Sequence, residues 1–116
     1  MQNNDFIKST AFNLVDMLDY FPNSVVIRSV FRKQTGSVTL LSFDAGEVHT
    51  GKTSPFEHFI QVIDGHAEVI IDDISSLVAT GESIIVPAFS RNIIKANTRF
   101  KILLTIIKSG YEEINL

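Results

Sequence analysis

Three histidines, His49, His58 and His66, are the side chains of this sequence with the widest chemical range. An imidazole can bind a metal ion, carry a proton near neutral pH, or serve as a hydrogen-bonded core residue. The chain has no cysteine, which excludes disulfides, thiolate metal sites and thiol nucleophiles. It also lacks a Gly-rich phosphate loop, a Gly-x-Ser-x-Gly elbow and a His-Glu-x-x-His pair. Any chemistry is therefore to be sought around the histidines.

The distribution of charged and apolar residues argues against several classes of protein. The net charge is −3 and the Lys and Arg residues are scattered, so we expect no nucleic-acid partner. Residues 1–5 carry no basic group and no apolar stretch follows them, so we expect no signal peptide. The most apolar run, residues 100–107, is interrupted by Lys101 and Thr105 and is shorter than the roughly 20 residues of a membrane span. The sequence predicts a cytoplasmic protein with no membrane partner.

From Val25 onward, short β-rich runs alternate with turn residues at intervals of about ten residues, which is typical of an all-β sandwich or barrel. Before Val25, the pattern favours a short strand followed by a helical turn. The Asp64-Gly65 pair predicts a tight hairpin, because it permits the positive φ angles of a two-residue turn. The expected strands cover residues 25–31, 37–43, 56–63, 66–72, 74–79, 83–86, 93–96 and 100–108.

The middle of the chain contains a regularly spaced frame of residues. Gly46, Lys52, Ser54, His58 and Gly65 occupy the positions of a motif that runs Gly, five residues, His, one, His, three or four, Glu, six, Gly. The spacing is kept throughout. At the three positions where the motif has His, His and Glu, this chain has Lys52, Ser54 and His58.

A second frame follows it. Gly81, Pro87, Phe89, Asn92 and Ala96 occupy a motif that runs Gly, five residues, Pro, one, Gly, two, His, three, Asn. Together the two frames resemble the paired motifs of the cupin superfamily, and the likeness is to its small single-domain members (cupin type 2, RmlC-like). The resemblance implies a double-stranded β-helix, the cupin jelly-roll barrel. This is an antiparallel two-sheet sandwich, open at one end.

In that family, three His and one Glu inside the barrel hold a divalent metal. Here a protonated Lys52 has no lone pair to give, and Ser54 and Asn92 offer neutral oxygens, which leaves His58 as the one strong donor. We therefore expect no metal at the usual position and no cofactor. The alternative is a divalent ion (Fe, Mn, Ni or Zn) held by His58 with His49, Glu47 or Glu57 turned inward as surrogate ligands.

Strand alternation would place residues 52, 54, 56, 58 and 60 on one face. We therefore expect one pocket whose lining includes Lys52, Ser54, His58, Asn92, Phe56 and Phe89, the two phenylalanines as wall. An ammonium, a hydroxyl, an imidazole and an amide together suit an anion such as a small carboxylate or phosphate. Two other interpretations stay open. His58 could be a hydrogen-bonded interior residue without a ligand, and a neutral Lys52 could act in Schiff-base or general-base chemistry.

At 116 residues the chain is long enough for one core and too short for a second. We predict a single cupin domain over 1–116, with an N-terminal segment (1–24), a barrel core (25–108) and a C-terminal tail (109–116). The resemblance also implies a homodimer. The apolar residues that would contribute to it from the N-terminal segment are Phe6, Phe12, Leu14, Met17 and Leu18.

The function predicted from these observations is that of a small-molecule-binding cupin barrel that lacks the usual metal and prefers an anionic ligand. One alternative is a metal-dependent cupin enzyme, an oxygenase, isomerase or lyase, that uses surrogate ligands. Another is a ligand-free module kept for assembly. No catalytic residue is indicated, and whether the protein is an enzyme stays open.

Overall fold

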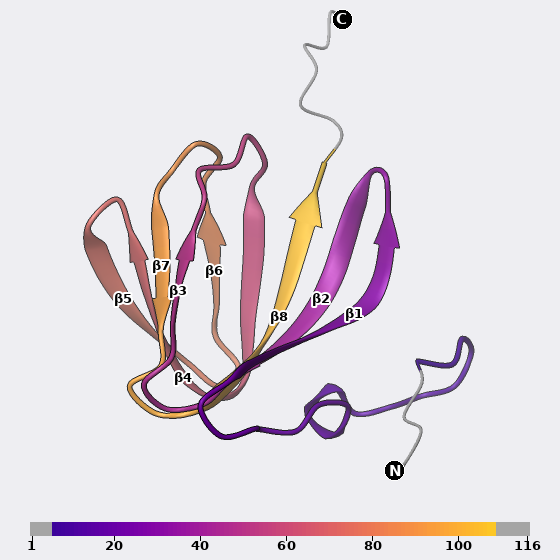
Figure 1. Ribbon diagram of the computed structural model, residues 1–116. Coiled ribbons are helices and arrows are strands. Elements are labelled where there is room, and N and C mark those ends of the chain that lie inside the picture. The colour runs from indigo at the N-terminus through magenta and orange to yellow at the C-terminus, as the bar shows by residue number, and fades with distance from the viewer. Residues whose placement is uncertain (1–5, 109–116) are drawn as a thin grey trace, which may run out of the picture.

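The structure, a computed structural model, describes residues 6–108 and consists of strands preceded by one short 3-10 turn, η1 (Leu14–Asp16) (Figure 1). In these residues no helix has the length and apolarity that crossing a membrane requires. The strands are β1 (Val25–Lys33), β2 (Gly36–Phe43), β3 (Val48–Gly51), β4 (His58–Ile71), β5 (Ile74–Ala79), β6 (Ser83–Val86), β7 (Asn92–Lys95) and β8 (Phe100–Ile107).

All strand pairs are antiparallel and divide into two sheets that share β4. The first half of β4 pairs with β8 and β6, and β8 continues the first sheet through β2 to β1. The second half of β4 pairs with β5 on one side and with β7 on the other, and β7 pairs with the edge strand β3. In Figure 1 the strands fan out from β5 on one side to β1 on the other. The predicted all-β, two-sheet antiparallel architecture is confirmed.

The hairpin predicted at Asp64-Gly65 is wrong, because β4 runs through these residues without a turn and bends from one sheet into the other (Figure 1). The positive φ of 82° at Gly65 serves this bend. The register with β8 shifts between Val62 and Asp64, and β8 passes close to Gly65. In a hairpin and in this bend alike, an Asp-Gly pair changes the direction of the chain. Here, however, the two halves of β4 pair with other strands and not with each other.

The closed end of the sandwich is filled by apolar side chains of both sheets. Phe43 and Phe100 are fully buried, and their rings stack with centroids 4.6 Å apart. Val62 and Val69, from the two halves of β4, belong to the same buried cluster. Burial of side chains of this size stabilises by about 1.5–3 kcal/mol each. This cluster therefore holds the two sheets together at that end.

Residues 6–24 lie across the outer face of the first sheet. Met17 and Leu18 are buried there against Leu40, so these two residues of the expected dimer surface already pack within their own chain. The Lys101 ammonium donates a hydrogen bond to the carbonyl oxygen of Val15 at 2.6 Å. The Arg28 guanidinium donates one to the carbonyl oxygen of Met17, also at 2.6 Å. The segment is thus fixed by apolar burial and by two charge-assisted hydrogen bonds.

Apart from β4, which the sequence divided into two strands, most strands were predicted within a few residues of their bounds. Two further differences lie where the pattern is least regular. Strand β3 (Val48–Gly51) was not predicted. Between residues 6 and 24 the helical turn is present as η1, but no strand precedes it. The division into segments stays a prediction. The first five residues and the tail 109–116 lie outside the described residues.

Gly65→Ala tests the bend in β4. An added Cβ would meet the carbonyl oxygen of Arg99 and would lie 3.1 Å from the Cα of Phe100. We expect the free energy of unfolding to fall by about 3 kcal/mol, about 1–2 kcal/mol of it from the left-handed backbone and the remainder from overlap with β8. Gly81→Ala is the matched control, because Gly81 has a φ of +88° and nothing lies within 4 Å of its added Cβ. Equal losses for both variants in urea unfolding would contradict a close approach at Gly65.

Candidate functional site

A cavity of about 200 Å³ lies between the two sheets. It is at the end of the barrel where β3 and β6 finish and where β4 and β7 begin, next to the connecting loops 52–57 and 87–91. The residues that line it are Leu41, His49, Gly51, Lys52, His58, Ile60, Asn92, Ile94, Ile102, Leu104 and Ile106.

The strand registers arrange this lining in layers. At the mouth, His58 is paired with Ile106 in the first sheet, and Asn92 is paired with Gly51 in the second. Because side chains on one face of a strand recur every second residue, the next layer lies about 6.7 Å deeper. The polar groups of the first layer are therefore close to the opening.

The deeper layers are mainly aliphatic. The second layer contains the paired residues Ile60 and Leu104 of the first sheet and Ile94 of the second, together with His49. The third contains Leu41, paired with Ile102. Beyond it lies the buried Phe43–Phe100 stack. The cavity is thus polar at its mouth and aliphatic toward its closed end.

The side chain of Asn92 depends on the glycine opposite it. A Cβ added to Gly51 would lie 2.8 Å from Nδ2 and 2.9 Å from Cγ of Asn92, so the amide lies directly over the glycine. Asn92 is only 6% exposed. Within residues 6–108, its side chain makes no hydrogen bond to protein. Because no fully buried side-chain nitrogen or oxygen of the described residues lacks a partner, the amide atoms of Asn92 must reach solvent. Asn92 lines both this cavity and a depression on the outer face of the second sheet. The amide is therefore accessible to a hydrogen-bonding ligand or to water.

His58 is half-buried at the start of β4, and burial lowers the pKa of its imidazole. At neutral pH it is therefore an uncharged ring with one donor and one acceptor nitrogen. Lys52 immediately follows β3 and is exposed while lining the cavity. Its aliphatic stem can lie along the mouth with the ammonium in water. Among the described residues that line the cavity, none carries a carboxylate.

The structure brings Lys52, His58 and Asn92 together but does not bring Ser54, Phe56 or Phe89 to the cavity. Residues 52–57 form a loop instead of a strand, so the alternation that would have aligned Ser54 and Phe56 with His58 does not apply. The Ser54 hydroxyl accepts a hydrogen bond from the Phe56 amide at 3.1 Å. Whether the three residues that meet bind a ligand stays a prediction.

The loops at the mouth are joined through two positions of the sequence motifs. The Phe89 amide donates a hydrogen bond to the carbonyl oxygen of Ser54 at 2.7 Å. Phe89 has a φ of 63° and a side chain that is 72% exposed. This is the left-handed conformation that favours glycine, the residue type that the second motif has at this position. Ser54 and Phe89 therefore shape the entrance instead of lining it.

The residues present do not fit the metal centre that the resemblance implies. His49, on the edge strand β3, lines the same cavity as His58, so two imidazoles are available there. The other polar groups are the Asn92 amide and the Lys52 ammonium, which would place a positive charge beside an ion. Among residues 6–108 there is no cluster of three or more His, Asp or Glu side chains that could hold a metal. Two imidazoles without a carboxylate make a weak site for Fe, Mn, Ni or Zn.

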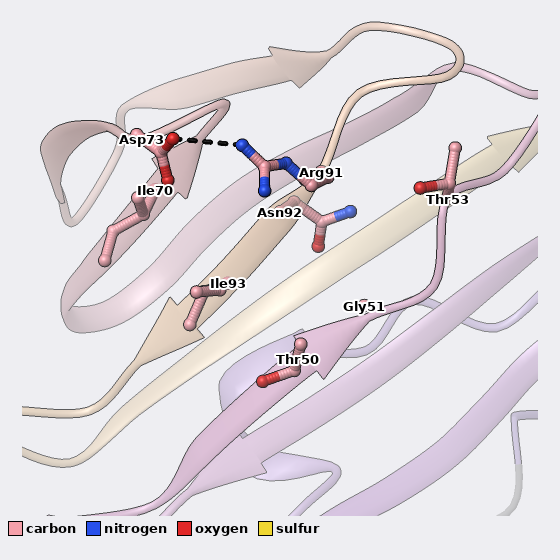
Figure 2. Close-up of a pocket in the computed structure, with 8 residues that line it drawn as sticks. All are labelled: Thr50, Gly51, Thr53, Ile70, Asp73, Arg91, Asn92 and Ile93. Atoms are coloured by element: carbon pink, nitrogen blue, oxygen red, sulfur yellow. Dashed lines mark hydrogen bonds and ion pairs between the residues drawn. The ribbon is translucent and has the colours of Figure 1, made fainter.

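A second depression, of about 310 Å³, lies on the outer face of the second sheet (Figure 2). Thr50, Ile93 and Ile70 form a row across β3, β7 and β4 at its base. Its two charged residues, Arg91 and Asp73, form an exposed ion pair at 3.0 Å. Since that guanidinium is already neutralised by a carboxylate, this depression is a weaker candidate for an anion than the cavity between the sheets.

Solved structures resemble this architecture over nearly its whole length. A conserved protein of unknown function from Streptococcus pyogenes is 24% identical, with a TM-score of 0.86 over 92% of this chain and 94% of that one. A cupin superfamily protein from Desulfitobacterium hafniense is 18% identical, with a TM-score of 0.84 over 94% of this chain and 100% of that one. The fold is that of the cupins. No protein-family model and no curated protein matches the sequence.

A further cupin 2 conserved barrel domain protein, from Leptotrichia buccalis, is 28% identical, with a TM-score of 0.80 over 84% of this chain. This chain spans 47% of that one. The predicted cupin jelly-roll fold is thereby confirmed. A shared cupin barrel does not supply a ligand or a reaction, because the barrel hosts unrelated functions.

Unfolding at different pH values tests the environment of His58. Burial places the pKa of the folded imidazole below its ordinary value of 6.5, so the unfolded chain takes up this proton first as the pH decreases. The free energy of unfolding should therefore be maintained above pH 6.5 and should decrease as the pH falls below it. His58→Gln should flatten that decrease in urea titrations, and His66→Gln, which removes an exposed imidazole, is the control. If His58→Gln leaves the slope as steep as before, another group causes it.

Proposed function

We propose that this cupin binds a small anionic molecule in the cavity between its sheets, without a metal. The observation that carries the proposal is the carboxylate-free mouth, at which a lysine, a histidine and an asparagine whose amide has no protein partner line one space. All three groups can donate hydrogen bonds to an anion. No acidic side chain of the described lining would repel it.

The protein need not change much to receive such a ligand. Gly51 already leaves room for the Asn92 side chain, and the loops of the mouth are joined by the Ser54–Phe89 hydrogen bond. A site that is ordered before binding loses little conformational entropy when the ligand enters. The cavity of about 200 Å³ is smaller than the pockets of about 300–1,000 Å³ that take drug-sized ligands. The ligand is therefore a small one.

A metal-dependent cupin enzyme remains the second candidate, and one observation favours it: His49 and His58 line the same cavity. Two imidazoles could hold an ion if the substrate itself supplied the missing oxygen donors. This candidate and the first are separated by metal analysis of the purified protein. Near-stoichiometric Fe, Mn, Ni or Zn that is lost in His58→Ala would favour the enzyme.

The expected homodimer and the cytoplasmic location stay predictions. Of the five N-terminal residues named for the dimer, Met17 and Leu18 are buried in their own chain, whereas Phe12 is 45% exposed. If the barrel is a ligand-free assembly module instead, it should associate in solution and show no stabilisation by small anions. Mass measurement in solution together with the following titration separates these cases.

Thermal unfolding with acetate, inorganic phosphate, Mn²⁺ or Zn²⁺ tests the proposed function. A ligand at ten times its Kd stabilises by about 1.4 kcal/mol, which raises the midpoint by roughly 4–8 °C. We expect such a shift with at least one anion and none of that size with metal alone. Lys52→Met and Asn92→Leu should each reduce the shift, whereas Lys33→Met, in which the altered lysine is outside the cavity lining, should keep it. Stabilisation by metals but by neither anion would refute the proposal.

A further inference from the structure

We propose that the ligand is a short aliphatic monocarboxylate, bound with its carboxylate at the mouth and its hydrocarbon tail toward the closed end. This inference rests on the proposed function and names the class of molecule for the same site. It depends on the order of the three layers of the cavity. The layers change from polar to aliphatic along one direction.

The deep part of the cavity favours an unsubstituted hydrocarbon. Apart from His49, an exposed residue of the edge strand β3, the residues that line the second and third layers have no polar group in their side chains. Those that are at most 6% exposed are Leu41, Ile60, Ile94 and Ile102. A hydroxyl group placed among them would lose its hydrogen bonds to water without replacement, at a cost of about 1–3 kcal/mol. Sugars, sugar acids and polyhydroxy acids are therefore poor ligands at this depth. A methyl or methylene group would gain by burial there.

The mouth favours a single negative charge. Lys52 is the one side chain with a permanent positive charge among the described residues that line the cavity. Burial keeps His58 uncharged at neutral pH by lowering its pKa. A carboxylate carries one charge on two oxygens, which can accept from the lysine and from the Asn92 amide. A phosphate monoester carries close to two charges at neutral pH, and the second would have no permanent counter-charge here.

The volume limits the length of the tail. Taking about 30 Å³ for each group of the size of a water molecule, a cavity of about 200 Å³ has room for about seven such groups. A carboxylate accounts for three of them, which leaves about four for the hydrocarbon. The acids expected to fit best are butyrate, pentanoate and their branched isomers. Longer chains would have to displace the Phe43–Phe100 stack, which closes that end.

Titration with the series from acetate to octanoate, followed by protein NMR, tests the inference. Each methylene buried should raise the affinity about four-fold, up to four or five carbons in the acid, after which the affinity should level off or fall. Butanol, which has a similar tail and no charge, should bind at least ten-fold more weakly than butyrate. Inorganic phosphate and glycerate should also bind more weakly than butyrate.

Two cavity variants identify the orientation. Leu104→Phe fills the second layer and should weaken pentanoate at least ten-fold while changing acetate less than three-fold. Asn92→Leu should weaken every acid of the series by a similar factor, because it removes a contact to the shared carboxylate. Thr105→Val is the control, since Thr105 is next to Leu104 on β8 but faces the outside of the barrel. NMR spectra of the free variants show whether each is folded.

The possible failures are distinguishable. If phosphate or glycerate binds more tightly than every alkyl acid, the monocarboxylate inference is overturned and the proposed anion site stands. The same holds if affinity is independent of chain length, or if Leu104→Phe affects all acids equally. If no anion of the set shifts the cavity resonances at the highest soluble concentration, the proposed function fails as well.

Discussion

The site depends on one strand that serves both sheets. Strand β4 begins at the mouth with His58, reaches the closed end at Gly65, and returns in the second sheet to pair with Asn92 at Ile71. This path requires a left-handed backbone at residue 65 and the close approach of β8. Only glycine meets both conditions without strain. The bend therefore sets the distance between the sheets, and with it places an imidazole and an amide across one cavity.

The burial that stabilises the barrel also determines the charge of its mouth. The core cluster draws the sheets together at the closed end, whereas polar residues replace aliphatic ones at the open end. Half-burial of His58 disfavours its charged form, so the positive charge comes from Lys52, which stays in contact with water. An anion at the mouth would thus meet one solvent-exposed cation and two neutral donors. The proposed anion site would therefore place no permanent charge in the core.

The fold could be predicted from the sequence because two spaced frames and the alternation of strands agree. Which strands pair with each other was harder to predict, since Asp64-Gly65 is equally compatible with a hairpin and with a bend between sheets. The expectation for Ser54 and Phe56 rested on strand alternation, which ends where β3 ends at Gly51. The position of His49 in the cavity lining follows from β3, a four-residue edge strand. This strand has exposed residues and no clear periodic pattern, so the sequence did not predict it. No local signal shows that Gly51 lies beneath Asn92, because residues of separate strands meet only in the folded chain.

The two motif frames keep their spacing in this chain, while the residue types at their ligand positions differ from those of the motifs. At position 89 the chain has a phenylalanine in a left-handed conformation, which costs about 1–2 kcal/mol relative to glycine. The amide of that residue still bonds to the carbonyl oxygen of Ser54, so the two loops meet through backbone atoms whatever side chains they carry. At the ligand positions, in contrast, the side chain itself is the functional group. With Lys52 and Asn92 at two of these positions, the entrance is intact and the groups around it can donate hydrogen bonds. In the proposed function these donors serve an anion, where electron-pair donors would serve a cation.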